Sequence, residues 1–284
     1  GAKSRRARGG NRLSQRLPWW KPLLLYPETM TANGFDSGER VFVREGFAWN
    51  AQAAYLFDID GTLLRSRDRI HYESFSHAVE QVLGRPLELA GVVLHGNTDP
   101  AILREAFERA GVADAVWRGR EQEIGARMSE YVLRRRAEMD LRVMPGVKAM
   151  LGYLRGRGAV LAVATGNLRE IGWLKVEVAG LREWFDFGGF SDGFERRAEM
   201  IAHALRLARQ VAGQDASVCV VGDTPFDISA ARANGLPVIV VATGNYSFDR
   251  LMEDEPQACA TTLQALLEDV RAAAADRAVP AGAD

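Results

Sequence analysis

The chain has 284 residues, of which 47% are hydrophobic and 26% charged, and its formal net charge is -1. This length can bury a substantial core in one or two domains, and the composition is that of a globular protein. The near-neutral charge gives no reason to expect a nucleic acid partner, and no apolar run approaches the roughly 20 residues that a membrane-spanning helix needs. We therefore expect a soluble protein that binds neither nucleic acid nor membrane. The composition says nothing about its oligomeric state.

The cysteines and histidines argue against two kinds of site. Cys219 and Cys259 stand in no metal-ligand spacing, so we expect small core residues rather than a disulfide, which favours a reducing, cytoplasmic location. The histidines are scattered, so neither a histidine metal site nor a Ser-His-Asp triad is expected. They are His71, His77, His95 and His203.

The first fifty residues differ from the rest of the chain. Up to Pro27 they contain seven basic residues and no acidic one, interspersed with Gly, Ser and Pro. Such a segment cannot bury enough apolar surface to fold, so residues 1–50 are expected to be a disordered basic extension. Two alternatives are a transit peptide and a basic arm for anionic surfaces, anchored by Pro18–Tyr26.

From residue 51 the chain alternates apolar runs with helix-like stretches. The runs at 53–59, 159–166, 217–223 and 236–244 lack polar alternation, as expected of strands that helices cover on both faces. The stretches between them have helical spacing, and several end with a Gly suited to the left-handed position after a helix. These stretches are 147–158, 168–181, 197–213 and 225–235. The pattern predicts an α/β fold with a doubly wound, Rossmann-like parallel sheet.

Between Arg65 and Met144 the strand pattern stops. Residues 72–84, 99–111 and 123–139 read as amphipathic helices instead. We expect an inserted α-helical cap domain over 67–143, a core made of 51–66 and 144–272, and a flexible tail over 273–284. The insertion begins just after the first predicted strand, so the cap should lie over the carboxyl ends of the strands, where open α/β sheets bind ligands.

Polar residues gather at the predicted strand ends. They are Asp58 and Asp60, Thr165 to Asn167, Asp223 and Asp227, and a second Thr-Gly-Asn at 243–245. Parallel strands deliver their carboxyl ends to one edge, so these groups should converge. Several carboxylates close together raise one another's pKa unless a cation intervenes, and Mg²⁺ suits oxygen ligands beside a phosphate.

The pair Asp58 and Asp60 suits phosphoryl transfer. One carboxylate can attack phosphorus as a nucleophile, while its neighbour protonates the leaving group and then activates water. The structural alternative is an aspartate pair at a strand edge that binds no metal.

Three motifs resemble those of the haloacid dehalogenase superfamily. They are DIDGT at Asp58–Thr62, ATGN at Ala164–Asn167 and GDTPFD at Gly222–Asp227, which match its motifs one, two and four in order and spacing. The resemblance covers about residues 51–270. It is strongest to the phosphoglycolate phosphatase-like group, whose helical cap is inserted after motif one.

This resemblance implies that Asp58 is the nucleophile that forms an aspartyl-phosphate and that Asp60 is the general acid and base. It implies that Thr165, with the neighbouring substrate-binding positions Gly166 and Asn167, holds the transferring phosphoryl oxygens, which need fixed donors as charge shifts. Thr165 could instead cap the helix expected from Leu168.

The resemblance also implies a Mg²⁺ site. Asp223 would bind the metal together with Asp58 and the backbone carbonyl of Asp60, while Asp227 would hold the metal's waters or its ligands. Asp227 also suits a helix start, with Pro225 as the first helical residue. The second Thr-Gly-Asn follows motif four, so we interpret it as the last strand's turn at the rim of the site.

Motif three departs from the family pattern. Most members place a Lys before the helix that precedes motif four, but DGFERRAEMIAHAL contains none. Arg196 or Arg197 must substitute, and the helix expected to start at Arg197 favours that residue, because a guanidinium can bridge carboxylate and phosphate. An exposed arginine at a helix start is the alternative.

Other chemistries fit less well. A dehalogenase needs no acid two residues after its nucleophile, and a phosphonate-cleaving relative needs a cap lysine, whereas residues 65–144 contain no Lys. A sugar-phosphate mutase like β-phosphoglucomutase shares both aspartates and stays open, although Thr62 favours hydrolysis. A non-catalytic binding module on the same fold is a further alternative.

The cap segment HGNTDPAIL, His95–Leu103, is similar to one that faces the active site in related phosphatases. By that likeness Asn97 and Thr98 are candidate substrate contacts, although Asp99 before Pro100 equally suits a helix start. A cap that opens and closes favours a small phosphorylated metabolite. The leading candidate is 2-phosphoglycolate, whose carboxylate needs a cation, and Asn97 stands where relatives offer Arg. Arg104, one turn away, is the candidate for that cation, although on a helix it is equally a solvated charge beside Glu108.

Overall fold

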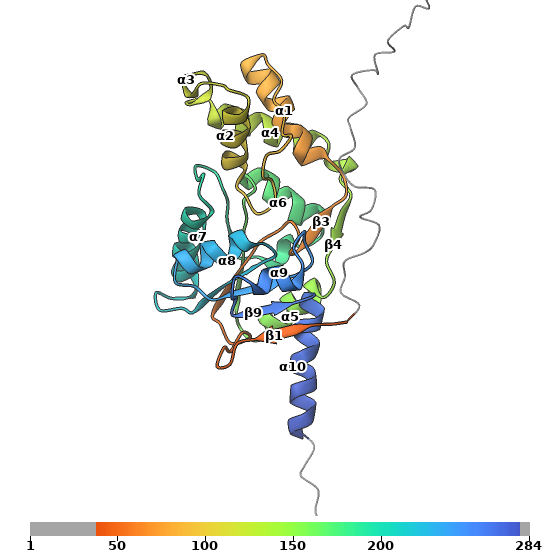
Figure 1. Ribbon diagram of the computed structural model, residues 1–284. Helices are drawn as coiled ribbons and strands as arrows, with labels where there is room; N and C mark the ends of the chain where they lie inside the picture. Colours follow the sequence, from red (N-terminus) through yellow and green to blue (C-terminus); the bar gives the residue numbers. More distant parts are fainter. Residues whose placement is uncertain (1–37, 279–284) are drawn as a thin grey trace, which may run out of the picture. The chain divides into compact units, whose positions relative to one another are not determined.

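The central sheet has seven strands in the order β1-β9-β8-β7-β2-β5-β6. The computed structural model describes residues 38–278, and Figure 1 shows the course of the chain. The strands are β1 (Val41–Val43), β2 (Ala54–Phe57), β3 (Leu64–Ser66), β4 (Leu141–Val143), β5 (Val160–Ala164), β6 (Phe187–Gly189), β7 (Val218–Gly222), β8 (Val238–Val241) and β9 (Ala258–Ala260).

Helices cover both faces of this sheet, as the sequence predicts. The α-helices are α1 (Ile70–Leu83), α2 (Asp99–Arg109), α3 (Asp114–Trp117), α4 (Glu121–Arg134), α5 (Val147–Gly156), α6 (Arg169–Val178), α7 (Arg197–Ala212), α8 (Pro225–Ala233), α9 (Phe248–Met252) and α10 (Leu263–Ala278). Short 3-10 turns lie at Arg136–Glu138 and Arg182–Trp184. On β2, Tyr55 and Phe57 pack with α5 and α10 on one face, while Leu56 packs with α7 and α8 on the other.

The register of the sheet aligns the motif-bearing strands. Phe57 of β2 lies beside Val163 of β5 and Val221 of β7, in parallel pairing on both sides. The residues that follow these three positions therefore leave the sheet at one edge, because parallel strands end on the same side. This alignment confirms the predicted convergence of strand ends.

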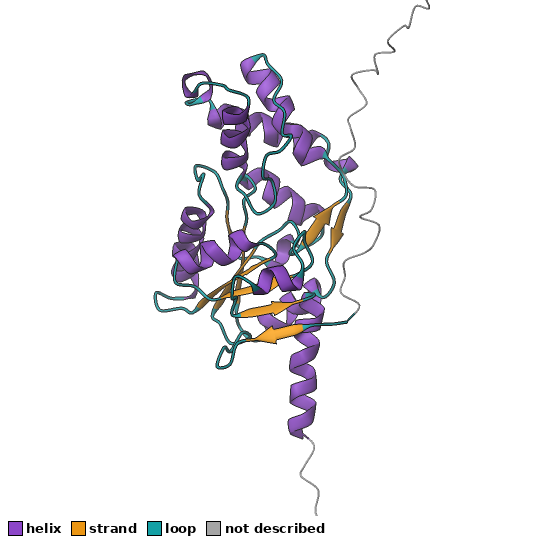
Figure 2. Ribbon diagram, in the orientation of Figure 1, coloured by secondary structure: helices purple, strands orange, loops and turns teal. Residues whose placement is uncertain are grey.

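The cap helices α1 to α4 lie together (Figure 1) and share one hydrophobic cluster. Its buried residues include Phe107 and Trp117, whose rings stack with centroids 4.9 Å apart. Leu168, Ile171 and Leu174, in and next to α6 of the core, belong to the same cluster, so the cap packs directly on that helix. The chain enters and leaves the cap through the antiparallel pair β3 and β4, drawn as the separate two-stranded sheet in Figure 2.

The predicted boundaries need two corrections. Residues 41–50 are not part of a disordered extension: β1 pairs antiparallel with β9, and Trp49 is buried in the core. A three-residue strand has too few residues to show a pattern, and its partner is more than 200 residues away. At the other end, α10 continues to Ala278, past the predicted start of the flexible tail at 273. The rest of the predicted extension, residues 1–37, lies outside the described residues.

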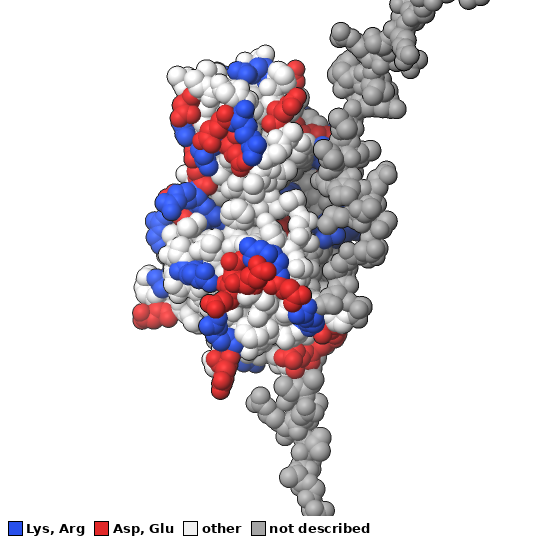
Figure 3. Space-filling model, viewed as in Figure 1, with Lys and Arg blue, Asp and Glu red and all other residues white. Residues whose placement is uncertain are grey.

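The cysteines, the length of the apolar helices and the surface charges bear on what the composition predicts. Cys219 and Cys259 are free and buried, which confirms them as core residues rather than a disulfide. Within residues 38–278, no helix is long and apolar enough to cross a membrane. The face in Figure 3 carries acidic and basic side chains next to one another rather than one wide patch of either sign.

Candidate active site

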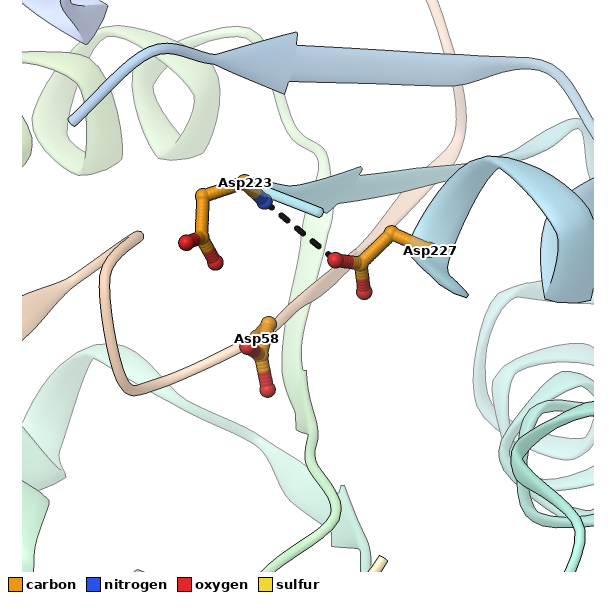
Figure 4. A group of neighbouring side chains, drawn as sticks. All are labelled: Asp58, Asp223 and Asp227. Carbon is orange, nitrogen blue, oxygen red and sulfur yellow. Dashed lines mark hydrogen bonds between the residues drawn. The ribbon is translucent and has the colours of Figure 1, made fainter. Parts of the chain in front are cut away.

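Three aspartates converge where β2 and β7 end. Asp58 follows β2, Asp223 follows β7, and Asp227 lies in the first turn of α8. One carboxylate oxygen from each lies within 4.8 Å of the other two, and all three residues are buried. Figure 4 shows the three side chains meeting from different segments. The Asp58 N–H donates to the Val221 carbonyl oxygen at 2.8 Å, which extends the β2–β7 pairing to the first aspartate.

The protonation of this cluster reflects its burial. Burial raises the pKa of Asp58 to about 6, and the charges of Asp227 and Asp60 add to this effect while Arg197 opposes it. Burial also raises the pKa of Asp223, with further contributions from Asp58 and Asp227. Carboxylates in such a cluster become fully ionised only when a cation compensates them.

Local structure fixes the two acids of the fourth motif. Thr224 accepts the Asp227 N–H, and the Asp227 carboxylate accepts the Thr224 N–H at 3.0 Å and hydroxyl at 2.7 Å, a capping box with Pro225 in the first turn. The predicted helix start is therefore confirmed. Thr62 donates to Asp223 at 3.2 Å. Gly244, in the second Thr-Gly-Asn, lies so close to Asp223 that any Cβ there would collide with the carboxylate.

Arg197 is the guanidinium that reaches the aspartates. Its Nη2 lies 3.0 Å from Asp58 and 2.7 Å from Asp227, and its side chain is only 6% exposed. Within residues 38–278, the buried Nε atom of Arg197 has no hydrogen-bond partner. Arg196 is 77% exposed and pairs with Glu199 instead. The structure thus brings Arg197, and not Arg196, to Asp58. That Arg197 replaces the motif-three Lys stays a prediction.

The acidic cluster fits a hard divalent cation. Among the described residues, Arg197 is the one cation that pairs with any of these three carboxylates, and it contacts Asp58 and Asp227. When ionised, the three therefore retain an excess of negative charge. The donor set is made of oxygen, which suits Mg²⁺ rather than a soft metal. Asp58 and Asp223 could hold such an ion directly, with Asp227 held beside them by its capping box.

Asp60 lies beside this cluster in a different environment. Its side chain is 41% exposed, and its Oδ2 accepts from Lys175 Nζ at 2.7 Å and Asn167 Nδ2 at 2.8 Å. Burial raises the pKa of Asp60, but the Lys175 ammonium and these hydrogen bonds lower it, and the net shift is downward. The two aspartates of the first motif are therefore held by different cations, Arg197 and Lys175.

Sequence reasoning missed Lys175. The chain has four lysines, at positions 3, 21, 148 and 175, and Lys175 lies inside an ordinary amphipathic pattern in α6. Its side chain is nevertheless 2% exposed. The signal that could have identified it is its position on the apolar face of that helix, four residues after the buried Ile171, because a buried lysine needs an acidic partner.

The second motif, Ala164–Asn167, contacts Asp60 through the Asn167 side chain and does not cap α6. Thr165 Oγ1 accepts from Asn167 Nδ2 at 2.7 Å, and the residue before α6 is Leu168, which makes no side-chain cap. The alternative role of Thr165 as a helix cap is therefore wrong. A Cβ at Gly166 would collide with the Asn97 carbonyl oxygen. Only glycine lets the cap approach the second motif this closely.

The cap segment reaches the site through its backbone and caps its own helix. Thr98 is the N-cap of α2: its hydroxyl accepts the Ala101 N–H at 3.2 Å and donates to the Glu195 carbonyl oxygen at 2.8 Å. The Asn97 amide donates to the Val93 carbonyl oxygen at 3.2 Å and accepts the Thr98 N–H. Substrate contact by Asn97 and Thr98 stays a prediction, and the structure gives both side chains another role.

Arg104 is already paired. It contacts Glu108 at 2.7 Å and Glu195 at 3.1 Å. Glu195 also pairs with Arg118 at 2.6 Å, so one core carboxylate joins arginines of the cap. The pairing with Glu108 confirms the alternative for Arg104, a surface charge beside that residue, and the pairing with Glu195 joins the cap to the core. A role of Arg104 toward a substrate carboxylate stays a prediction.

Comparison with known proteins identifies several relatives. A family model described as haloacid dehalogenase-like hydrolase matches residues 55–241. Tyrosine-protein kinase PtkA of Mycobacterium tuberculosis is 28% identical over 77% of this chain and 71% of its own. The protein named Probable phosphatase IndB of Dickeya dadantii is 29% identical over 73% of this chain and 88% of its own. A phosphoglycolate phosphatase of Chromobacterium violaceum is 28% identical over 67% of this chain and 85% of its own.

Solved structures share the fold. A protein described as a predicted phosphatase from Clostridium acetobutylicum has a TM-score of 0.58 at 20% identity, over 78% of this chain and 99% of its own. A hydrolase from Pseudomonas syringae has a TM-score of 0.58 at 16% identity, with the same coverage.

Proposed function

Since the chain belongs to the haloacid dehalogenase-like hydrolase family and is a phosphoric monoester hydrolase, we propose the course of its reaction. It hydrolyses a small phosphomonoester with Mg²⁺, through an aspartyl-phosphate that forms on Asp58. One observation carries this proposal. Asp58 lies at the shared edge of the sheet beside the acids Asp223 and Asp227, and the buried Arg197 contacts both Asp58 and Asp227.

The proposed reaction has two steps. In the first, an Asp58 carboxylate oxygen bonds to phosphorus, the bond from phosphorus to the leaving oxygen breaks, and Asp60 gives that oxygen a proton. In the second, water attacks phosphorus, Asp60 takes its proton, and Asp58 is released with inorganic phosphate. The products are an alcohol and phosphate, and the net reactant besides the ester is one water.

Arg197 supplies positive charge to this chemistry. Its Nη2 already contacts Asp58, and its Nε, which has no hydrogen-bond partner among the residues that the structure describes, is a donor that a phosphoryl oxygen could use. Thr165, Gly166 and Asn167 lie at the end of β5 on the same edge and are proposed to orient the phosphoryl group. When bound, Mg²⁺ would neutralise the carboxylates and stabilise charge on the phosphoryl oxygens, held by Asp58, the Asp60 carbonyl and Asp223, with Asp227 beside it.

The substrate class is a small phosphorylated metabolite, and the leading candidate within it is 2-phosphoglycolate. Support comes from the relatives named phosphoglycolate phosphatase, at 28–29% identity. The close approach of the cap at Gly166 favours small substrates as well. Because Arg104 is paired with Glu108 and Glu195, the cation for the substrate carboxylate would have to come from another residue.

A second candidate is phosphoryl transfer to or from tyrosine. It is favoured by the similarity to PtkA, which matches over a larger share of this chain than the phosphoglycolate phosphatases do. The same nucleophile would serve in either direction. Asp58 would take the phosphoryl group from a nucleoside triphosphate and pass it to the phenolic oxygen of tyrosine, or take it from phosphotyrosine, with the phenol as leaving group, and pass it to water.

One substrate panel separates these candidates. The purified chain is assayed for phosphate release from 2-phosphoglycolate, sugar phosphates, nucleotides and phosphotyrosine, with Mg²⁺ and with EDTA. Turnover of 2-phosphoglycolate well above the other esters supports the leading candidate, and a preference for phosphotyrosine supports the second. Interconversion of β-glucose 1-phosphate and glucose 6-phosphate without phosphate release would indicate a mutase. Failure on every ester would favour a non-catalytic binding module.

A further inference from the structure

Lys175 makes a fixed set of contacts beside the first motif. Its Nζ lies 2.7 Å from Asp60 Oδ2, 2.9 Å from Asn167 Oδ1 and 3.1 Å from His71 Nδ1. An ammonium group has three N–H donors, and each has an acceptor here. Lys175 therefore has no donor left for a substrate, and at 2% exposure it has little contact with solvent.

From this geometry we infer that Lys175 is a positioning residue, which orients the Asp60 carboxylate for proton transfer. The inference rests on the proposed function, in which Asp60 is the general acid and base. Asp60 Oδ2 accepts from both Lys175 and Asn167, so that oxygen is fully engaged. The oxygen left to exchange a proton with the leaving group or the water is Oδ1. A freely rotating carboxylate would present either oxygen, and holding one of them reduces the orientations that must be lost on reaction.

The cap completes this arrangement. Lys175 donates to His71 Nδ1, so the ring carries its hydrogen on Nε2, which lies 3.2 Å from Asp99 Oδ2. The same Asp99 oxygen accepts the Leu168 N–H of the core at 2.8 Å. His71 belongs to α1 and Asp99 to α2, both in the cap, whereas Lys175 and Asp60 belong to the core. The chain of contacts from Asp99 through His71 and Lys175 to Asp60 therefore connects the position of the cap with the orientation of Asp60.

If Lys175 had a purely structural role, the effect of replacing it on activity would be different. If Lys175 served only to compensate Asp60, a methionine of similar length would fill its space, and Asp60, which is 41% exposed, would be solvated by water. Activity would then change equally for all substrates, or not at all. A residue that acts through the general acid matters most where the leaving group needs a proton.

The test compares two aryl phosphates with different leaving groups. Wild type, Lys175→Met, Asp60→Asn and the double variant are assayed with Mg²⁺ on phenyl phosphate, a poor leaving group, and p-nitrophenyl phosphate, a good one. We expect Lys175→Met to lower kcat/KM for phenyl phosphate by roughly 10-fold or more and to change that for p-nitrophenyl phosphate much less, because general acid catalysis is worth roughly 10²–10⁴-fold where a proton is needed. The double variant should be no slower than Asp60→Asn, since both changes act on one group.

Controls keep the outcome specific. Lys148→Met removes an exposed lysine of α5 and should change neither substrate's rate. His71→Ala keeps Lys175 and removes one of its acceptors, so it should show the same leaving-group dependence with a smaller amplitude. If Lys175→Met does not fold, the two aryl phosphates are compared in His71→Ala instead. Inhibition by inorganic phosphate should be unchanged in both variants.

Several results would overturn the inference. They are an equal loss on both substrates, a double variant whose loss is the product of the single losses, a raised KM with unchanged kcat, and His71→Ala rates equal to those of wild type. The proposed function fails separately, if wild type turns over neither ester or if Asp58→Asn keeps its activity.

Discussion

Arg197 Nη2 lies 3.0 Å from Asp58, and both side chains are buried. A guanidinium in this position favours the ionised form of Asp58, the proposed nucleophile, and would offer its charge to a phosphoryl group bound there. Asp227 accepts from the same nitrogen at 2.7 Å, so a second carboxylate of the acidic cluster holds the arginine in place. The contact links the nucleophile to the charge that would stabilise its transition state.

Replacing Asp58 with Asn should abolish phosphate release while the fold survives, because an amide does not attack phosphorus and is a poor ligand for Mg²⁺. Turnover is measured beside thermal unfolding, with Asp215→Asn, an exposed aspartate, as the matched control. More than a few per cent of wild-type activity in a well-folded Asp58→Asn protein would show that Asp58 is not the nucleophile.

Replacing Arg197 with Ala should lower turnover by roughly 10²-fold or more, on the scale of one lost transition-state charge contact. Arg196→Ala is the adjacent control and should do little, because Arg196 is 77% exposed. Steady-state rates with saturating Mg²⁺ check both variants. The reverse order of effects would move the role to Arg196.

Without Mg²⁺, stability should fall as the pH rises from about 4 to above 6. The folded-state pKa of Asp58 is raised from 3.8 to about 6, so the folded protein binds more protons than the unfolded chain in this range, and raising the pH favours unfolding. Asp223 shifts in the same direction. The lowered pKa of Asp60 acts oppositely, and its stabilising contribution is lost only as the pH falls below its ordinary value near 3.8.

Urea unfolding of the EDTA-treated protein at a series of pH values measures this slope. Asp58→Asn should flatten it, and added Mg²⁺ should raise stability more at pH 7.5 than at pH 5, because the metal binds the ionised carboxylates. A metal-free stability that rises steadily between pH 4 and 7 would contradict the assigned direction.

Removing Glu195 should weaken cap closure. Its carboxylate pairs with Arg104 and Arg118 and is 36% exposed, so each pair is worth about 1 kcal/mol or less and is screened by salt. Glu195→Gln should raise KM by roughly 2–5-fold at low ionic strength, and the difference should disappear near 1 M salt. Glu253→Gln removes a surface pair with Arg250 and serves as the control. If the effect of Glu195→Gln on KM were independent of salt, the ion pairs of Glu195 would not be what holds the cap closed.

Truncation separates β1 from the residues before it. A chain that starts at residue 46 lacks β1, which pairs with β9 at Val41, Phe42 and Val43, and its midpoint of thermal unfolding should fall by several degrees. A chain that starts at residue 38 keeps the strand and is the matched control. Equal unfolding midpoints for the two truncated chains would show that β1 contributes nothing to stability.

The sequence by itself determined the architecture and the acids of the candidate site. Four uninterrupted apolar runs identified β2, β5, β7 and β8, because a strand buried on both faces has no polar alternation. Asp58, Asp223 and Thr165 directly follow three of these runs. Their convergence could be predicted because parallel strands end at one edge. Arg197 could be favoured over Arg196 from its place at the start of a helix.

Only the tertiary structure decided which groups surround those acids. The contact of Lys175 with Asp60 spans 115 positions and depends on how α6 packs between the sheet and the cap. β1 is recognisable only through its pairing with β9, and Thr98 proved to be a helix cap that donates to Glu195. Strand and helix periodicity are local properties of the chain, whereas a contact between distant side chains depends on the relative placement of whole elements, which periodicity does not encode.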